Sequence, residues 1–172
     1  MPSFEEYYNR LPVDGTITYV PANSYFRYSA DDLVDRFAGT GIKALLIVNP
    51  DNPSGNFIVR DDLLRLCDWT FKNGISLVVN ESFVDFADGE ADEHTLLNDS
   101  LLERFPNLIV IKSISKSYGV PGLRLGVAAS ADTDLISDLQ KRCSIWNINS
   151  FAEYYMQIYG KYEGDYKTAC KR

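Results

Sequence analysis

Short, continuous apolar runs alternate along the chain with longer segments in which apolar residues recur every three or four positions. Runs of this length without polar interruption are typical of strands that are covered on both faces of a sheet. A further short extended run, 17–20, follows the turn signal Asp14-Gly15. The pattern predicts four buried strands, at 44–48, 75–79, 108–111 and 125–129.

The segments between these runs have the signals of helix ends. Ser29 can cap a helix that ends near Gly39. Asp61 and Asp62 place negative charge at the start of a second helix, which stops at Asn73-Gly74. We expect later helices from Asp132 and from Ser150 to about 161, a polar surface loop over 85–100, and a short helix or mobile end in the tail.

Alternating strands and helices indicate the α/β class, here a three-layer, mainly parallel sheet with helices on both faces. Ligands of such sheets bind beyond the carboxyl ends of the strands. Polar motifs follow three of the predicted strands at that edge, so one crevice could collect all three. They are Asn49-Pro50-Asp51-Asn52-Pro53-Ser54-Gly55, Asn80-Glu81-Ser82-Phe83 and Lys112-Ser113-Ile114-Ser115-Lys116.

Composition removes several classes of function. A net charge of −7 argues against nucleic acid as a partner. The longest apolar stretch is too short for a membrane span, and no signal peptide is visible. Three widely spaced cysteines and a single histidine, His94, favour neither a disulfide framework nor a metal site. We therefore expect a cytoplasmic protein with no membrane or nucleic-acid partner.

Each motif is ambiguous by itself. The segment NPDNPSG is rich in turn-forming residues and could be a turn with no further role. Lys116 could be one of the many surface lysines of a soluble protein. Arg124 could neutralise a neighbouring carboxylate.

Taken together and in order, the motifs NPDNPSG, VVNESFVDF and SISKSYGVPGLRLG change this picture. Their combination resembles the pyridoxal-phosphate (PLP) aminotransferases of fold type I. Within that group the chain looks most like histidinol-phosphate aminotransferase and its relative threonine-phosphate decarboxylase. The resemblance covers nearly the whole chain.

The resemblance implies pyridoxal 5′-phosphate as cofactor and gives the motif residues their roles. Lys116, not Lys112, matches the lysine that forms the internal aldimine and later moves the substrate α-proton. Ser113, Ser115 and Arg124 match the residues that bind the cofactor phosphate. Asn52 matches the residue that hydrogen-bonds the ring hydroxyl, and Phe4 matches the aromatic residue that stacks on the pyridine ring.

Two positions depart from the family pattern. Asn80 stands where the family has an aspartate beneath the pyridine nitrogen, and a neutral amide cannot hold a pyridinium by charge. Our hypothesis is that the electron sink is weaker here. Phe83 stands where many members have a tyrosine that hydrogen-bonds the ring oxygen.

The same resemblance implies that residues 1–172 are part of a PLP-binding large domain. The family's N-terminal segment, with a second phosphate-binding loop, and its C-terminal small domain, with the arginine that grips the substrate carboxylate, are absent from this sequence. We expect open sheet edges and uncovered apolar faces to make the chain self-associate. We also expect it to bind PLP poorly by itself.

Three functions remain open. The first is an aminotransferase that moves the amino group of a small amino acid or amino-phosphate to a 2-oxo acid, by way of Lys116. The second is an amino-acid-phosphate decarboxylase on the same scaffold. The third, from another class, is a non-catalytic truncated domain that acts in assembly.

Overall fold

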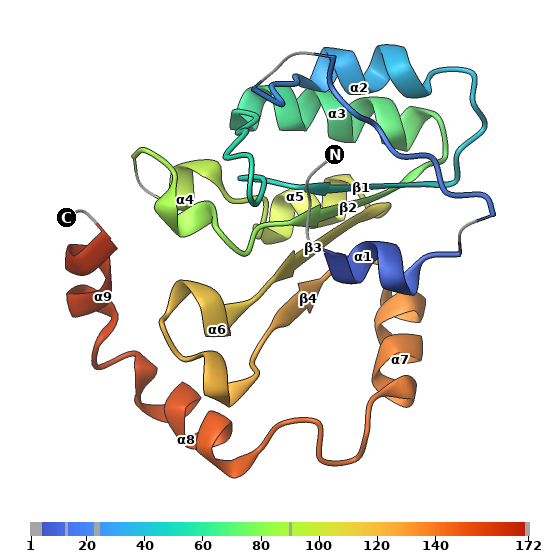
Figure 1. The fold of residues 1–172 in the computed structure, drawn as a ribbon. Coiled ribbons are helices and arrows are strands. Elements are labelled where there is room, and N and C mark those ends of the chain that lie inside the picture. The colour runs from blue at the N-terminus through green and yellow to red at the C-terminus, as the bar shows by residue number, and fades with distance from the viewer. Residues whose placement is uncertain (1–4, 13, 23–24, 90, 171–172) are drawn as a thin grey trace.

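The fold is that of a computed structural model, which describes residues 5–12, 14–22, 25–89 and 91–170. Four strands form one sheet in the order β1-β2-β3-β4 (Figure 1). The first three are parallel and the fourth is antiparallel to β3. The α/β class and the mainly parallel sheet are thus confirmed. The strands are β1 (Ala44–Val48), β2 (Ser76–Asn80), β3 (Leu108–Lys112) and β4 (Val127–Ala129).

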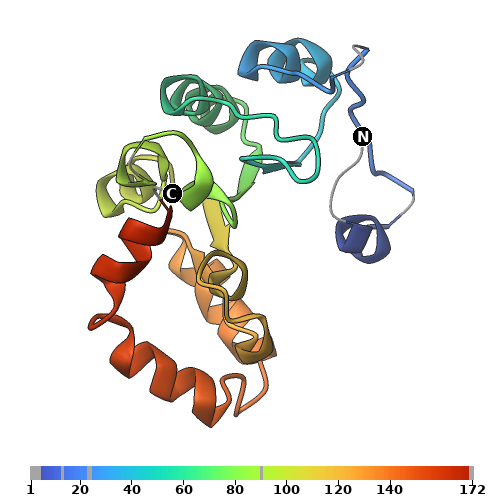
Figure 2. The same ribbon diagram turned by 60° about the vertical axis from the view of Figure 1, so that its left-hand side comes forward.

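Helices lie on both sides of this sheet. The helices α2 and α3 lie together on one side of β1 and β2, and α1 lies on the other side in both views (Figures 1 and 2). The α-helices are α1 (Glu5–Arg10), α2 (Ala30–Phe37), α3 (Arg60–Lys72), α4 (Ala91–His94), α5 (Asp99–Arg104), α6 (Ile114–Ser117), α7 (Thr133–Arg142), α8 (Ser150–Tyr159) and α9 (Glu163–Cys170). Two 3-10 helices are η1 (Val84–Phe86) and η2 (Pro121–Leu123).

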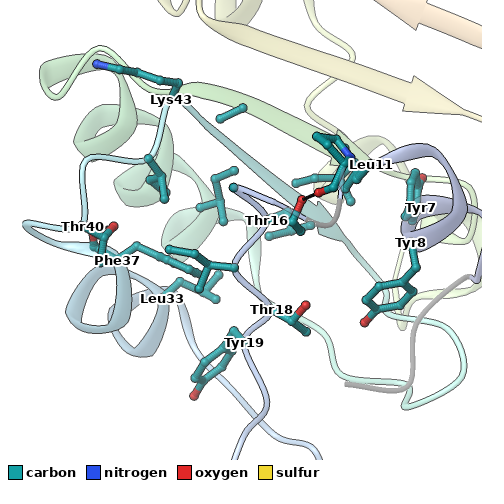
Figure 3. Close-up of a pocket in the computed structure, with 18 of the residues that line it drawn as sticks. Tyr7, Tyr8, Leu11, Thr16, Thr18, Tyr19, Leu33, Phe37, Thr40 and Lys43 are labelled. Carbon is teal, nitrogen blue, oxygen red and sulfur yellow. Dashed lines mark hydrogen bonds between the residues drawn. The ribbon is translucent and has the colours of Figure 1, made fainter.

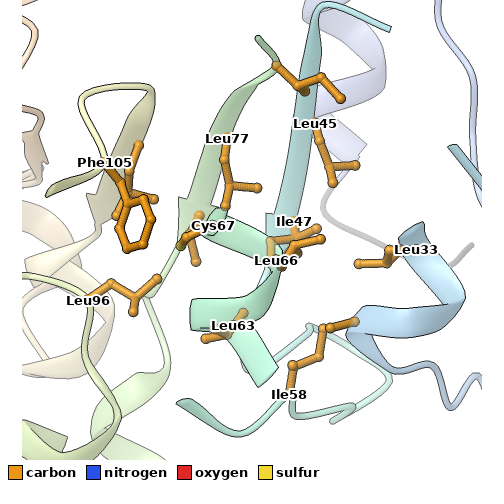
Figure 4. Close-up of a cluster of buried hydrophobic side chains, with 14 of the residues drawn as sticks. Leu33, Leu45, Ile47, Ile58, Leu63, Leu66, Cys67, Leu77, Leu96 and Phe105 are labelled. Carbon is orange, nitrogen blue, oxygen red and sulfur yellow. The ribbon is translucent and has the colours of Figure 1, made fainter. Parts of the chain in front are cut away.

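The two faces of the sheet are buried to different extents. Side chains alternate across a strand, and on one face they are fully buried against α3 and its neighbours (Figure 4). Alternate residues on the other face are only partly buried, as at Leu46, Val78 and Ile109. The predicted three layers are present, but one interface carries most of the core. Its strand residues are Leu45, Ile47, Leu77, Val79, Leu108 and Val110, and those of α3 are Leu63, Leu66 and Cys67.

The helix ends follow from local chemistry that the sequence displays. The Ser29 hydroxyl accepts from the Asp32 backbone N–H, and the Asp32 carboxylate accepts from the Ser29 N–H. This reciprocal capping box fixes the start of α2. The helix α3 ends at Asn73, and Gly74 follows with φ 63°, a left-handed conformation that glycine adopts without steric cost.

Residues 17–20, predicted as a short extended run, are part of no strand of the sheet. Two other segments differ from what the sequence predicted. The polar segment 85–100 is not a simple surface loop, because it contains η1 and α4 and buries Leu96 completely. The strand β4 starts at Val127, two residues later than expected, because the Leu125 backbone is hydrogen-bonded to Ser115 instead.

The outer edge of β1 borders a large apolar cavity. The cavity has a volume of about 660 Å³ and is lined by α1, residues 15–19, α2 and β1 (Figure 3). Leu33 and Phe37 of α2 and Leu11 and Tyr8 near α1 line it. No helix in the described part of the chain is long and apolar enough to cross a membrane.

Candidate functional site

A pocket opens where the carboxyl ends of β2 and β3 meet the start of β4. Because β4 runs antiparallel, its first residue lies at the same edge of the sheet as the last residues of β2 and β3. The pocket has a volume of about 460 Å³. Its polar and charged lining residues are Tyr7, Asn80, Ser82, Lys112, Ser113, Lys116 and Arg124. The structure thus brings four of the predicted site residues, Asn80, Ser113, Lys116 and Arg124, into one pocket.

Lys116 lies on α6, a single helical turn that follows β3 directly. Its neighbours Ser115 and Ser117 are buried, whereas the Lys116 side chain is exposed. The Lys116 Nζ lies 5.1 Å from the centre of the Phe83 ring, within the range of a cation–π contact. Phe83 therefore contacts the predicted lysine, although it does not line the pocket itself.

Two predicted phosphate-binding serines have different surroundings. The Ser115 hydroxyl is buried, accepts from the Leu125 N–H at 2.7 Å and donates to the Leu125 carbonyl at 3.2 Å. Ser113 lines the pocket, and its hydroxyl makes no capping bond to α6. The backbone N–H of Ser113 donates to the Ser82 hydroxyl at 2.9 Å. The side chain of Ser113 therefore faces the pocket, whereas that of Ser115 closes the loop between α6 and β4.

Arg124 is the residue on which the chain turns from η2 into β4. Its backbone is left-handed, with φ 54° and ψ 45°. Such a conformation is uncommon for a residue other than glycine, and residues held in it cluster at functional sites. The side chain of Arg124 is exposed at the pocket, where a guanidinium can bind a phosphate with two parallel hydrogen bonds.

Asn80 ends β2, and both ends of its amide are hydrogen-bonded. Its Oδ1 accepts from the Ser82 backbone N–H at 2.9 Å, and its Nδ2 donates to the Tyr7 hydroxyl. Burial raises the pKa of the Tyr7 hydroxyl, so Tyr7 is a neutral phenol at physiological pH. Tyr7 comes from α1, which lies 73 residues earlier in the chain than Asn80.

Two predicted residues remain, Asn52 and Phe4. Asn52 lies in the loop after β1 and is half-buried, but it is not among the described residues that line the pocket. Phe4 lies outside the described residues. The loop after β1 is nevertheless held by contacts of its own. The Asn49 side chain donates to the Ile58 carbonyl and accepts from the Ile58 N–H.

The sequence assigned no role to three residues that shape the site. Tyr7 holds Asn80, and Ser82 accepts from Ser113 through its hydroxyl and from Ser117 through its carbonyl. Lys112 forms a buried ion pair with Asp85 at 2.7 Å. The length of the apolar run at β3 could have pointed to Lys112, because a charge that ends a buried strand needs a partner.

The lining residues fit PLP. They offer an amine for an aldehyde carbon, a guanidinium and a hydroxyl for a phosphate, and an amide N–H for a ring nitrogen. No group of three side chains able to hold a metal ion occurs among the residues that the structure describes.

An α/β domain with this lysine, arginine and serine at the carboxyl edge of its sheet has the arrangement of the fold type I PLP enzymes. The profile of the family "Aminotransferase class I and II" matches residues 2–157. The chain belongs to this family, whose members depend on PLP.

The relatives of this chain differ from one another in activity. Over its whole length the chain is 34% identical to a CMP-5′-(3-aminopropyl)phosphonate synthase of Streptomyces rubellomurinus, covering 27% of that protein. Over 92% of its length it is 30% identical to an L-serine phosphate decarboxylase of Sulfurospirillum multivorans, covering 41% of it. Histidinol-phosphate aminotransferases are also among the relatives.

A solved structure shows the same fold. A decarboxylase from Sulfurospirillum multivorans matches 99% of this chain with a TM-score of 0.81 and 26% identity. The match covers 49% of that decarboxylase. The chain thus spans about half of the solved relative and less than half of the two sequence relatives described above.

Proposed function

We propose that this chain is the cofactor-lysine part of a PLP enzyme that decarboxylates a small amino acid carrying a phosphate or phosphonate group. The observation that carries the proposal is the single pocket that holds Lys116, Arg124, Ser113 and Asn80. The names of the relatives support the substrate class, since a serine phosphate decarboxylase and an aminopropylphosphonate synthase are among them.

PLP, when bound, supplies an aldehyde carbon for an amine and a conjugated ring that accepts electrons from the substrate. Lys116 would hold the cofactor through Nζ, and the same amine would carry a proton to the substrate α-carbon. Its position on a short exposed turn, against the Phe83 ring, leaves Nζ able to move between these two tasks.

Arg124 and Ser113 hold the cofactor phosphate in this proposal. The guanidinium supplies two parallel donors, and the Ser113 hydroxyl supplies a third. Ser115 acts through the loop, because its two bonds to Leu125 fix the distance between α6 and the turn at Arg124. As the family pattern implies, Asn52 and Phe83 would contact the ring from the loops after β1 and β2, and Phe4 would stack on it.

Transamination is the second candidate, since histidinol-phosphate aminotransferases are also relatives. Both reactions use the same lysine. They would differ in the bond that breaks at the substrate α-carbon: the bond to the carboxyl carbon in decarboxylation, and the bond to hydrogen in transamination. We place both reactions in the cytoplasm and in a homo-oligomer, and we propose that the rest of the gene product supplies the substrate-carboxylate site.

The test is a product analysis of the full-length gene product that contains this chain, loaded with PLP. We expect O-phospho-L-serine or O-phospho-L-threonine to yield carbon dioxide and the amine. Lys116→Ala should lower turnover by at least about a thousandfold, since it removes the covalent link and the proton carrier together. Lys141→Ala, an exposed lysine of α7, is the matched control and should leave turnover unchanged.

The result also separates the alternatives. Formation of a 2-oxo acid in place of carbon dioxide would establish transamination. Absence of both products, together with no PLP attached to Lys116 after borohydride reduction, would contradict an enzymatic role and favour a non-catalytic domain that acts in assembly.

A further inference from the structure

The pocket has an unbalanced charge. Three of its lining residues, Lys112, Lys116 and Arg124, are cationic, and none of the described lining residues is an aspartate or glutamate. The charge of Lys112 is matched by Asp85, which lies outside the pocket lining at 2.7 Å from the Lys112 Nζ. No carboxylate of the described lining can therefore stabilise a positive charge that develops on a bound ring.

The orientation of the Asn80 amide is fixed by its neighbours. The Ser82 backbone N–H can only donate, so the oxygen of the amide must face it. The nitrogen of the amide then faces Tyr7, whose hydroxyl accepts one of its two hydrogens. An amide nitrogen carries two hydrogens, so one N–H remains to point elsewhere. Asn80 and Tyr7 both line the pocket.

We propose that Asn80, held between Tyr7 and Ser82, donates this second N–H to the ring nitrogen of PLP and keeps that nitrogen unprotonated. The inference rests on the proposed function, because it requires PLP in this pocket. An N–H donor needs a lone pair on its partner, and a pyridinium has none.

Tyr7 is a positioning residue in this arrangement. It does not need to touch the cofactor, since its hydroxyl acts by holding the amide plane of Asn80. Removing the hydroxyl would leave Asn80 with one anchor, Ser82, and a weaker hydrogen bond to the ring nitrogen.

An unprotonated ring accepts less negative charge than a pyridinium does. When carbon dioxide leaves, the electron pair of the broken carbon–carbon bond would therefore stay more on the substrate α-carbon, where it would bond a proton from Lys116. The amide at position 80 would thus favour decarboxylation over transfer of the amino group.

The test measures the protonation state of the ring nitrogen directly. The full-length gene product is loaded with PLP carrying ¹⁵N in its ring, and the ¹⁵N resonance is recorded. We expect the downfield position of an unprotonated pyridine in the wild-type protein. Asn80→Asp should move the resonance upfield to the pyridinium position, because a carboxylate can hold the proton. Tyr7→Phe should move it further downfield, toward pyridine with no hydrogen bond.

The matched control is Tyr8→Phe, which removes a hydroxyl from the adjacent position of the same helix, outside this pocket. It should leave the resonance where it is in the wild-type protein. A wild-type resonance at the pyridinium position would overturn the inference without reference to any variant, even if Asn80→Asp did not fold.

The failure of this inference can be told apart from failure of the proposed function. Borohydride reduction followed by peptide mass spectrometry reports whether PLP is attached to Lys116. Attachment at Lys116 with a pyridinium resonance would overturn only the role of Asn80. No attachment would overturn the proposed function and this inference with it.

Discussion

Single hydroxyls around Lys116 have distinct tasks, although the sequence presents them in one short motif. Ser113 faces the pocket, Ser115 bonds the Leu125 backbone, and Ser117 donates to the Ser82 carbonyl at 2.8 Å. The difference arises because Ser113 precedes α6, whereas Ser115 and Ser117 lie within its single turn and point in different directions.

Ser115→Ala tests this division. It leaves the buried N–H of Leu125 without its partner, whereas the Leu125 carbonyl still accepts from the Ser115 backbone N–H. The free energy of unfolding should therefore fall by about 1–3 kcal/mol. Ser113→Ala should change that free energy by less than about 0.5 kcal/mol, because the Ser113 hydroxyl makes no capping bond to α6. It should weaken PLP binding instead. Urea unfolding and a PLP titration of both variants are the measurements. Equal losses of stability would contradict the assignment.

The sequence predicted part of the site at this scale. The strand ends of a parallel sheet share an edge, and this argument predicted correctly that Asn80, Ser113 and Lys116 lie together. It did not bring Asn52 of the motif after β1 into the described pocket lining, and Arg124 was predicted from the family resemblance alone. Tyr7 could not be predicted, since its contact with Asn80 depends on how α1 packs across the sheet. The family resemblance assigned Ser115 to the cofactor phosphate. Its hydrogen bonds to Leu125 could be seen only in the structure.

At the scale of elements, Glu81 connects the end of β2 to the segment before α5. Glu81 is buried, and its carboxylate accepts from the Thr95 hydroxyl at 2.6 Å and from the Leu96 N–H at 2.7 Å. Burial raises the pKa of the Glu81 carboxyl, and these two hydrogen bonds only partly offset it. This contact is the reason that the polar segment 85–100 folds back and buries Leu96.

The raised pKa predicts how stability depends on pH. The folded protein retains the Glu81 proton at a pH where the unfolded chain, with a pKa near 4.5, has lost it. The contribution of Glu81 to stability is therefore present below the unfolded pKa and lost as the pH rises through the folded pKa. Unfolding free energies measured across this range should fall with pH for this reason. Glu81→Gln should remove that component of the slope, whereas Glu103→Gln, an exposed residue of α5, should not.

The sequence predicted these elements well where periodicity and caps agree. The parallel strands, α2, α3 and α7 begin or end within a residue or two of the predicted positions. The prediction of a surface loop over 85–100 was wrong, because the folding of this segment depends on contacts of Thr95 and Leu96 with Glu81. Hydrophobic periodicity does not reveal such contacts. The antiparallel direction of β4 could not be predicted either, since an apolar run does not show which way its strand runs in the sheet.

On the scale of the whole molecule, apolar surface gathers at one end of the chain. Ile145 and Trp146 are 95% and 90% exposed, and Phe151 is 80% exposed. Contiguous exposed apolar residues of this kind mark surfaces that pack against a partner. The connection between α7 and α8 in Figure 1 carries the first two.

We predict that the 172-residue chain self-associates through this surface. The double variant Ile145→Ser, Trp146→Ser should reduce association, because it removes the two most exposed apolar side chains described. Val20→Ser, at an exposed apolar residue elsewhere, serves as the control. Sedimentation over a range of concentrations measures the effect, and a wild-type chain that remains monomeric throughout would refute it.

The loop that joins Lys116 to Arg124 has a consequence for how this protein can vary. Ser115 and Leu125 bond to each other at its two ends, so the loop has a fixed span and a fixed number of residues. One residue inserted or deleted inside it would displace the amine or the guanidinium from the pocket. No described hydrogen bond joins the two ends of the connection between α7 and α8, so this connection can change in length more freely. We therefore expect the number of residues between Lys116 and Arg124 to stay constant as the protein evolves.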